Sequence, residues 1–362
     1  MPPPSLVGMT ATAQDSAQSS SAQDPARLST AQDPARLGTA QDPARSGPVS
    51  GRTASGGEER GPRRPSLSPS RAADFKTCPL LYRFRTIDRL PERRSPAAVR
   101  GTLVHAVLER LYDLPACERT AEAARELVAP AWEELRADPE VAALFTSDGA
   151  AGGAPGAAAP DGPSPEVPAA EVTSLEEWLA SAGELVQTYF SLEDPSRIEP
   201  HGREELVEVT LPDGLLLRGY VDRLDVAPNG ALRVVDYKTG SVPREAFEGK
   251  ALFQMKFYAL VLWRTRGVVA SQLKLLYLGN GDALTYSPDE AELVRFERTL
   301  QAIWAAIERA VATGDFRPNR TRLCGWCDHQ ALCPSFGGTP PPFPAEAAAA
   351  AGWATLPVVD RD

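Results

Sequence analysis

The chain has 362 residues, of which 43% are hydrophobic, so it can bury a substantial core as one large domain or two smaller ones. Its net charge of −10 argues weakly against nucleic acid as a partner. No apolar run of about 18 residues predicts a transmembrane helix, and the N-terminus lacks the basic and apolar regions of a signal peptide. We therefore expect a cytoplasmic protein without a membrane partner.

The N-terminal residues 1–65 contain a short repeat. The motif AQDPAR occurs three times, and each copy has a proline and almost no apolar bulk. Such repeats cannot form a hydrophobic core, so we expect a disordered tail. The folded domain is expected at 66–338, with a Gly/Ala/Pro-rich insertion near 148–170 and a flexible tail at 339–362.

The domain is predicted to begin with helices. After a short helix at 71–76, residues 101–112 carry apolar side chains at helical spacing, and His105 and Glu109 lie four apart on one face. A lone histidine on a helix is more often structural than functional. A functional interpretation of His105 therefore depends on the residues that join it.

Two more helices are expected before the strands. One lies within 114–145. The next begins at Thr173 or Ser174, because each of these residues has a glutamate three positions later, which is the spacing of a capping box.

Three strands follow, joined by short turns. Residues 205–211 form the first strand, and Pro212-Asp213-Gly214 turns the chain into a β-hairpin. The strands of the hairpin are expected at 215–226 and 231–238, around the turn Pro228-Asn229-Gly230.

The hairpin makes a geometric prediction about two acids. Asp222 and Asp236 are equidistant from Asn229, so they should lie near each other across the two strands, unless a bulge shifts the register. Lys238 follows Asp236 by two residues and shares its face. Such a trio is most often a solvated strand face. However, Asp236 follows an apolar strand in which an unpaired carboxylate is costly, and lysine is rare in this chain, with 5 among 38 basic residues.

The remaining elements complete an α/β core. A helix is expected at 244–266 with Gln254 and Tyr258 one turn apart, then a strand at 273–278 and a long helix at 288–313. Because a helix separates the last strand from the hairpin, that strand can join the sheet in parallel. The predicted sheet is therefore mixed.

Two carboxylates and an imidazole would form a site for a hard cation. Mg²⁺ prefers oxygen ligands, and Mn²⁺ tolerates an added histidine nitrogen better. A metal beside Lys238 is typical of a hydrolytic site, in which the metal lowers the pKa of its water and the lysine stabilises developing charge. The implied substrate is a phosphodiester.

The C-terminal cysteines indicate a second metal site. Cys324 and Cys327 form a Cys-x2-Cys pair, and Cys333 follows closely. Cys78 is the preferred fourth ligand, with His329 as the competing choice, whereas Cys117 is more consistent with a spare thiol. Four thiolates suit either zinc or an iron–sulfur cluster, and spacing alone leaves both open. Either metal would link the N-terminal segment at Cys78 to the C-terminal cysteines.

Basic residues concentrate near the start of the domain. From Arg60 to Arg100 there are 11 basic residues and 3 acids, so this segment carries +8 in an otherwise acidic chain. We expect this segment to contact a phosphate backbone, together with three arginines near the cysteines: Arg317, Arg320 and Arg322.

Together, the segments GTLVHAVLERL, GYVDRLDV, VVDYKTG, QMKFYALVL and CGWCDHQALCP resemble the RecB-family exonucleases of the PD-(D/E)XK nuclease superfamily. The likeness extends over about 66–338 and is greatest to members with a C-terminal iron–sulfur cluster, as in the AddB nuclease domain. It implies a restriction-endonuclease-like αβββαβ core with flanking helices. No Gly-x4-Gly-Lys-[Ser/Thr] motif occurs, so the chain lacks a P-loop helicase motor.

The resemblance also implies roles for individual residues. The metal ligands would be His105, Asp222 and Asp236, and the catalytic lysine would be Lys238. Two helix residues would line the site and contact DNA: Gln254 and Tyr258.

Weaker candidates for support near the metal are Glu109 and Glu208, together with the backbone carbonyl of Val235 or Tyr237. The cluster ligands would be four cysteines, which makes a 4Fe-4S cluster the preferred interpretation over zinc: Cys78, Cys324, Cys327 and Cys333.

The resulting hypothesis is a Mg²⁺- or Mn²⁺-dependent DNA exonuclease that acts at single-stranded ends in DNA repair or recombination, alone or with a separate helicase. One alternative is a module that binds DNA ends without cutting them. Another is a redox sensor that responds through the cluster, which has no support in the sequence beyond the cysteines themselves.

Overall fold

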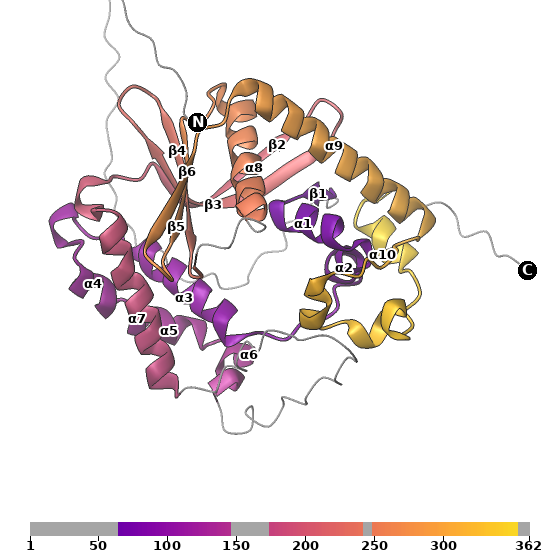
Figure 1. The fold of residues 1–362 in the computed structure, drawn as a ribbon, viewed down its shortest axis with the longest axis horizontal. Coiled ribbons are helices and arrows are strands. Elements are labelled where there is room, and N and C mark those ends of the chain that lie inside the picture. Colours follow the sequence, from indigo (N-terminus) through magenta and orange to yellow (C-terminus); the bar gives the residue numbers. More distant parts are fainter. Residues whose placement is uncertain (1–63, 146–173, 242–247, 354–362) are drawn as a thin grey trace, which may run out of the picture. The chain divides into compact units, whose positions relative to one another are not determined.

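The computed structural model describes residues 64–145, 174–241 and 248–353 (Figure 1). The expected disordered tail at 1–65 lies outside these ranges except for its last two residues, and the insertion near 148–170 lies wholly outside them. None of the described helices is long and apolar enough to span a bilayer.

The described strands form one mixed sheet in the order β1-β3-β4-β5-β6, with β2 paired to β3. The β2–β3, β3–β4 and β5–β6 pairs are antiparallel, whereas β4–β5 is parallel, as the helical crossover predicts. The strand bounds are β1 Ser66–Leu67, β2 Gly202–Thr210, β3 Leu216–Val226, β4 Leu232–Lys238, β5 Gln272–Tyr277 and β6 Asp282–Tyr286. The predicted α/β class with a mixed sheet is confirmed.

The predicted hairpin is β3 and β4. Its turn closes with a hydrogen bond from the Gly230 N–H to the Ala227 carbonyl at 2.8 Å, and Gly230 takes a positive φ of 82°, which glycine adopts without strain. β1 and β6 are strands that the sequence pattern does not predict. β1 has two residues, and β6 is largely solvent-exposed, so it lacks a buried apolar run.

The helices differ most from expectation between 114 and 145. One helix was expected there, but the chain breaks into α4, α5 and α6, because Thr120 and Asp138 cap new helices and Pro139 occupies a first turn. Ser174 rather than Thr173 caps α7, with a complete capping box. The helix bounds are α1 Pro69–Thr77, α2 Pro79–Tyr82, α3 Pro96–Leu111, α4 Ala121–Glu126, α5 Val128–Leu135, α6 Pro139–Ala142, α7 Leu175–Leu192, α8 Glu248–Arg266, α9 Glu290–Thr313 and α10 Ala345–Ala350.

Two hydrophobic cores lie on opposite faces of the sheet. One contains residues of α8 and α9, and the other contains residues of α3, α5 and α7, so the helices form a layer on each side (Figure 1). The alternation of a strand is visible in β4, where Val234 belongs to the first core and its neighbour Val235 to the second.

The C-terminal segment corrects one expectation. A flexible tail was expected at 339–362, but the part described, to residue 353, packs against the domain. Phe343 stacks on Phe316 with ring centroids 5.8 Å apart, and Trp353 packs on Trp304 at 4.9 Å. Burial of these aromatic rings stabilises a segment whose Pro/Ala-rich composition suggested a loose chain. Residues 354–362 lie outside the described ranges.

Candidate active site

The candidate site lies where β3 and β4 separate. Their ladder ends with the pair Arg223–Val235, so Asp222 and Asp236 are the next residues on the two strands. At this point Asp222 replaces the missing backbone partner, because its Oδ2 accepts a hydrogen bond from the Tyr237 N–H at 2.8 Å. The predicted opposition of the two aspartates is therefore consistent with the observed register.

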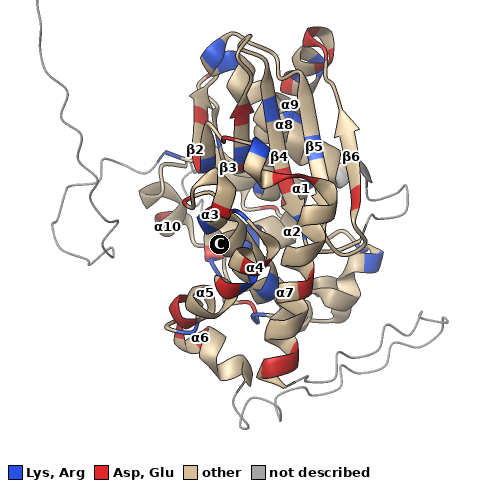
Figure 2. Ribbon diagram, turned by 90° about the vertical axis from the view of Figure 1, so that its left-hand side faces the viewer, with Lys and Arg blue, Asp and Glu red and all other residues tan. Residues whose placement is uncertain are grey.

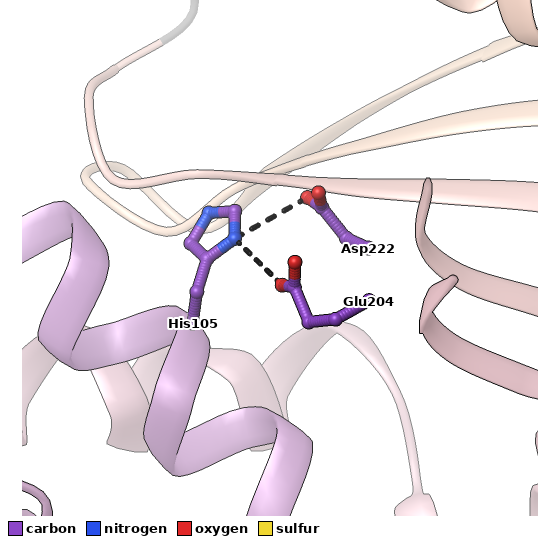
Figure 3. A group of neighbouring side chains, drawn as sticks. All are labelled: His105, Glu204 and Asp222. Carbon is purple, nitrogen blue, oxygen red and sulfur yellow. Dashed lines mark hydrogen bonds and ion pairs between the residues drawn. The ribbon is translucent and has the colours of Figure 1, made fainter. Parts of the chain in front are cut away.

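A third carboxylate joins the two aspartates from β2. In the β2–β3 ladder the pairs on either side of Glu204 place it opposite Asp222. Glu204 has a φ of 43°, which is uncommon for a residue other than glycine and marks a local irregularity of the strand. Glu204, Asp222 and His105 offer ligand atoms that all lie within 4.8 Å of one another (Figure 3).

His105 reaches this group from α3. Its Nδ1 lies 3.4 Å from Glu204 Oε1 and 3.6 Å from Asp222 Oδ2. Its Nε2 donates to the Tyr237 carbonyl at 3.0 Å, since a carbonyl can only accept. Burial alone would lower the pKa of His105, but the neighbouring Glu204 and the two aspartates raise it to about 9. Without a metal the site therefore holds a positive charge among its acids.

Asp222 shows the electrostatic cost of this crowding. Burial, followed by repulsion from Asp236, raises the pKa of Asp222 to about 7, although His105 and the Tyr237 N–H act in the opposite direction. A carboxylate with this pKa gains from any bound cation that neutralises it.

Asp236 is the most buried of the three acids, with 1% of its surface exposed. The Lys238 ammonium lies 2.6 Å from Asp236 Oδ2, yet neither carboxylate oxygen receives a hydrogen bond of normal geometry from the residues that the structure describes. Lys238 therefore compensates the charge of Asp236, and Oδ1 is the carboxylate oxygen that remains for another ligand. The donor set of carboxylates and one imidazole fits Mg²⁺ or Mn²⁺.

A chain of polar contacts continues from Asp236 to α8. Lys238 Nζ donates to Gln254 Oε1 at 3.0 Å, and Gln254 Nε2 donates to the Tyr258 hydroxyl at 3.0 Å. Burial alone would lower the pKa of Lys238, but Asp236 raises it, so the ammonium stays charged. Gln254 therefore gives the Lys238 ammonium a second oxygen partner besides Asp236.

The structure thus brings all six sequence-predicted residues into one region, and it adds Glu204. The ligand atoms that lie within 4.8 Å of one another are those of His105, Glu204 and Asp222, and this group does not include the predicted ligand Asp236. The sequence signal for Glu204 was the turn before β3: Glu204 and Asp222 are equidistant from Asp213, just as Asp222 and Asp236 are from Asn229. Of the weaker candidates, Glu208 faces Arg218 at 3.9 Å on another part of β2. The other, Glu109, is one helical turn beyond His105 and outside the metal-ligand group, and burial raises its pKa.

A comparison with known families identifies the superfamily of this chain. A model of the PD-(D/E)XK nuclease superfamily matches residues 66–334, which is more than half of the chain. The chain belongs to this superfamily. The name describes a motif that Asp236, Tyr237 and Lys238 reproduce as D-x-K, with Asp222 as the preceding aspartate.

The names of the most similar phage proteins state an organism but no activity. The chain is 26% identical over 287 residues to the Gene 69 protein of Mycobacterium phage D29, covering 75% of this chain and 97% of that protein. It is 33% identical over 129 residues to the Gene 69 protein of Mycobacterium phage L5, covering 34% and 41%, respectively. A solved structure of a candidate exonuclease from Eubacterium rectale aligns at 13% identity with a TM-score of 0.44, covering 73% of this chain and 87% of that one.

The superfamily domain carries a second group of candidate ligands. The four predicted cysteines all line one small cavity of about 50 Å³ between α2 and the C-terminal turns. Backbone N–H groups donate to two of the sulfurs: Asn319 to Cys78 Sγ at 3.4 Å and Thr321 to Cys324 Sγ at 3.3 Å. Such donors stabilise thiolates, so the cavity fits a metal centre.

The other two candidates for this group lie elsewhere. His329 Nε2 contacts Glu92 Oε1 at 3.1 Å, and its ring packs on the edge of Phe84, so it is not part of the cysteine cavity. Cys117 is exposed on the loop after α3 and does not line the cavity. Both observations favour Cys78 as the fourth ligand.

The basic segment before α3 is less available to phosphates than its +8 charge suggested. Arg83 is buried against Asp88 at 3.0 Å, and Arg85 pairs with two acids, one of which is Asp74 at 2.7 Å. Arg94 contacts Asp138 at 3.0 Å. In Figure 2, positions of Lys and Arg (blue) and of Asp and Glu (red) are interspersed along the ribbon. The acids that pair with Arg83 and Arg85 are already subtracted in the +8, so among these pairs only that of Arg94 lowers the net charge further.

Proposed function

We propose that this chain is a Mg²⁺- or Mn²⁺-dependent DNA exonuclease that hydrolyses phosphodiesters at single-stranded ends, in DNA repair or recombination. Membership of a nuclease superfamily supports hydrolysis of phosphodiesters. One observation supports the site: Asp236 is buried beside Lys238 with no normal hydrogen-bond donor among the described residues, next to Asp222 and His105.

The metal would be held by Asp222, Asp236 and His105, with Glu204 and the Tyr237 carbonyl as further oxygen donors. When bound, a divalent ion lowers the pKa of its water and neutralises a phosphoryl oxygen. These donors come from β2, β3, β4 and α3, so packed secondary-structure elements rather than loops would position them.

Lys238 would act on the phosphate and on the attacking water. Its charged ammonium lies between Asp236 and Gln254, so it can donate to a phosphoryl oxygen or orient a nucleophile beside the acids. Gln254 and Tyr258 would hold Lys238 in position and contact the substrate. The site would thus be assembled from the carboxyl end of β4 and one face of α8.

We assign the chain to the RecB-like exonucleases with a C-terminal 4Fe-4S cluster, held by Cys78, Cys324, Cys327 and Cys333. All four sulfurs line one cavity, and backbone N–H groups donate to those of Cys78 and Cys324, which supports a shared metal centre. The preference for 4Fe-4S over zinc follows from the resemblance of the cysteine pattern to that of the cluster-bearing relatives.

Iron analysis tests this assignment. Anaerobically purified protein should be brown and contain iron rather than zinc. Cys78→Ser should lower the iron content, whereas Cys117→Ser should leave it unchanged. Zinc without iron would refute the cluster. Equal iron in both variants would remove Cys78 from the ligand set.

The nuclease proposal is tested with end-labelled and internally labelled DNA. Single- and double-stranded substrates are incubated with Mg²⁺ or Mn²⁺, with Asp236→Ala as the control. The wild type should release short products from single-stranded ends, and Asp236→Ala should not. Binding without release in both proteins would favour the non-cutting module. Equal cleavage by both would show that the assigned site is wrong.

We also propose that the protein works in the cytoplasm. The chain carries no P-loop motif, so the protein would act either alone or with a separate helicase. Blunt duplexes test this point. If duplex cleavage requires an added helicase while single strands are cut without it, a motor partner is supported.

A further inference from the structure

A groove of about 690 Å³ opens beside the candidate active site. It shares Gln254 and Tyr258 with the polar chain that holds Lys238. Its other walls come from α1, from the middle of β3 and from the Phe253 ring. A substrate chain that leaves the reacting phosphate can therefore continue directly into this groove.

An exposed tyrosine lies in this groove. Tyr220 precedes Asp222 by two residues on β3, and 56% of its surface is exposed. Its hydroxyl makes no hydrogen bond within the part of the chain that the structure describes. An exposed aromatic ring next to a reaction centre offers a stacking surface for a planar ligand.

Arg218 supplies positive charge on the same wall. Its side chain is 43% exposed, and its ion pair with Glu208 is long, at 3.9 Å. The other two arginines of the groove are more engaged, because Arg71 donates to Ser66 at 3.0 Å and Arg85 pairs with Asp74 at 2.7 Å. With three arginines and one acid among its lining residues, the groove is cationic in an otherwise acidic chain.

Gly219, between Arg218 and Tyr220, connects the groove to the active site. A Cβ at this position would meet Tyr258 Cε1 at 2.9 Å and Pro69 Cδ at 3.4 Å. Tyr258 therefore packs directly against the β3 backbone at Gly219, between the positions of Arg218 and Tyr220. Because Tyr258 also receives a hydrogen bond from Gln254, the stacking surface and the lysine share one support.

We propose that this groove binds the unpaired nucleotides next to the scissile phosphate, with a base stacked on Tyr220 and a phosphate held by Arg218. The inference rests on the proposed nuclease function and names the residues that would select a single strand. An unpaired base can place its face on an aromatic ring, whereas the faces of bases inside a duplex are already stacked. Stacking tolerates any base, so the preference concerns strandedness rather than sequence.

The first test measures binding without hydrolysis. A fluorescein-labelled 20-mer of oligo-dT is titrated by anisotropy with full-length protein in Ca²⁺. Tyr220→Ala should weaken binding about tenfold, and Tyr220→Phe, which keeps the ring, should bind within about twofold of wild type. Val268→Ala removes exposed apolar carbons outside the groove and serves as the matched control.

The second test measures charge. Arg218→Ala should reduce the dependence of log K on log salt by about 0.7, the value for one phosphate contact on a single strand. Arg298→Ala, an exposed arginine on α9 that does not line the groove, should leave that slope unchanged.

The outcomes separate the two proposals. If the wild type cuts DNA but Tyr220→Ala binds and cuts as well as wild type, the groove assignment is wrong and the nuclease stands. If the wild type binds the oligonucleotide through Tyr220 but cuts nothing, the nuclease proposal fails and the groove stands. Loss in both Tyr220→Ala and Tyr220→Phe would indicate a hydroxyl-dependent structural role and overturn the stacking model. If Tyr220→Ala loses the same fraction of its affinity for duplex and for single-stranded DNA, the proposed preference for a single strand is wrong.

Discussion

Adjacent residues of the β3–β4 hairpin build two polar regions with opposite characters. One is centred on Arg223, which is 1% exposed. Its guanidinium donates to the Tyr237 hydroxyl at 2.9 Å, to Glu193 at 2.7 Å and to Asp225 at 3.0 Å. It also donates to two further hydroxyls: Tyr112 and Tyr189.

The charges of the Arg223 region are matched. Burial alone would raise the pKa of Glu193, but Arg223 and Lys274 hold it below its usual range. In the active-site region the same burial leaves Asp222 with a raised pKa and Asp236 without a normal hydrogen-bond donor among the described residues. The two aspartates are about as buried as Glu193 and Asp225, so burial alone does not distinguish structural charge from functional charge. The difference is the balance of charge: three cationic side chains contact the two acids of the Arg223 region, whereas three acids share His105 and Lys238 in the active-site region.

Tyr237 connects the two regions. Its N–H donates to Asp222, its carbonyl accepts from His105, and its hydroxyl accepts from Arg223. The charge-balanced network around Arg223 therefore holds the backbone of Tyr237, and this backbone positions Asp222 and His105 in the active site. This arrangement agrees with a site that must hold like charges together before a cation arrives.

The comparison predicts the largest stability effect at Arg223. Arg223→Ala should lower the free energy of unfolding by about 3–5 kcal/mol, because the buried Glu193 loses its main partner, Asp225 keeps only Arg233, and three buried tyrosine hydroxyls lose their donor. Urea denaturation measures the loss, with the exposed Arg298→Ala as control. A loss below about 1 kcal/mol would mean that this network is not structural.

Lys238 should have a large effect on activity instead. Lys238→Ala should reduce kcat for a single-stranded substrate by about 10²–10³-fold, since it removes the charge that stabilises the transition state. Lys238→Arg should recover little, because a planar guanidinium does not replace the compact ammonium between Asp236 and Gln254. Full activity in Lys238→Ala would exclude the proposed role.

Asp222 should show the opposite stability effect from Arg223. Its folded-state pKa of about 7 lies above the usual 3.8, so ionised Asp222 destabilises the metal-free fold once pH exceeds the unfolded value. Asp222→Asn should therefore raise stability in chelator at pH 8, on the order of 2 kcal/mol. The gain should shrink as pH falls through 7 towards 4. Thermal unfolding at both pH values measures it, and a destabilised variant at pH 8 would contradict this sign.

The smallest effect is expected at the link between the regions. Tyr237→Phe removes one hydroxyl acceptor of Arg223 but keeps the backbone contacts to Asp222 and His105. We expect a stability loss of about 1 kcal/mol and a smaller change in nuclease rate. If the loss of rate, converted to an activation free energy, exceeds the loss of stability, then the hydroxyl network also affects catalysis.

Local sequence determined a large part of this protein. The hairpin follows from two apolar-rich strands around a Gly-containing turn, and counting from Asn229 places Asp222 opposite Asp236. The start of α7 follows from the capping residues Ser174 and Glu177. These features depend on interactions within a few residues or on the fixed register of one turn, so a pattern can predict them.

Only the tertiary structure decided which charges are compensated. Arg223 resembled any strand arginine until α3 and α7 brought Tyr112 and Tyr189 to it, and Glu204 became a candidate ligand only when α3 placed His105 beside it. The packing of Trp353 on Trp304 and the pairing of Arg85 with Asp74 are likewise contacts between separate elements. The physical reason is that the free energy of a buried charge depends on all the groups around it, and these come from segments far apart in the chain.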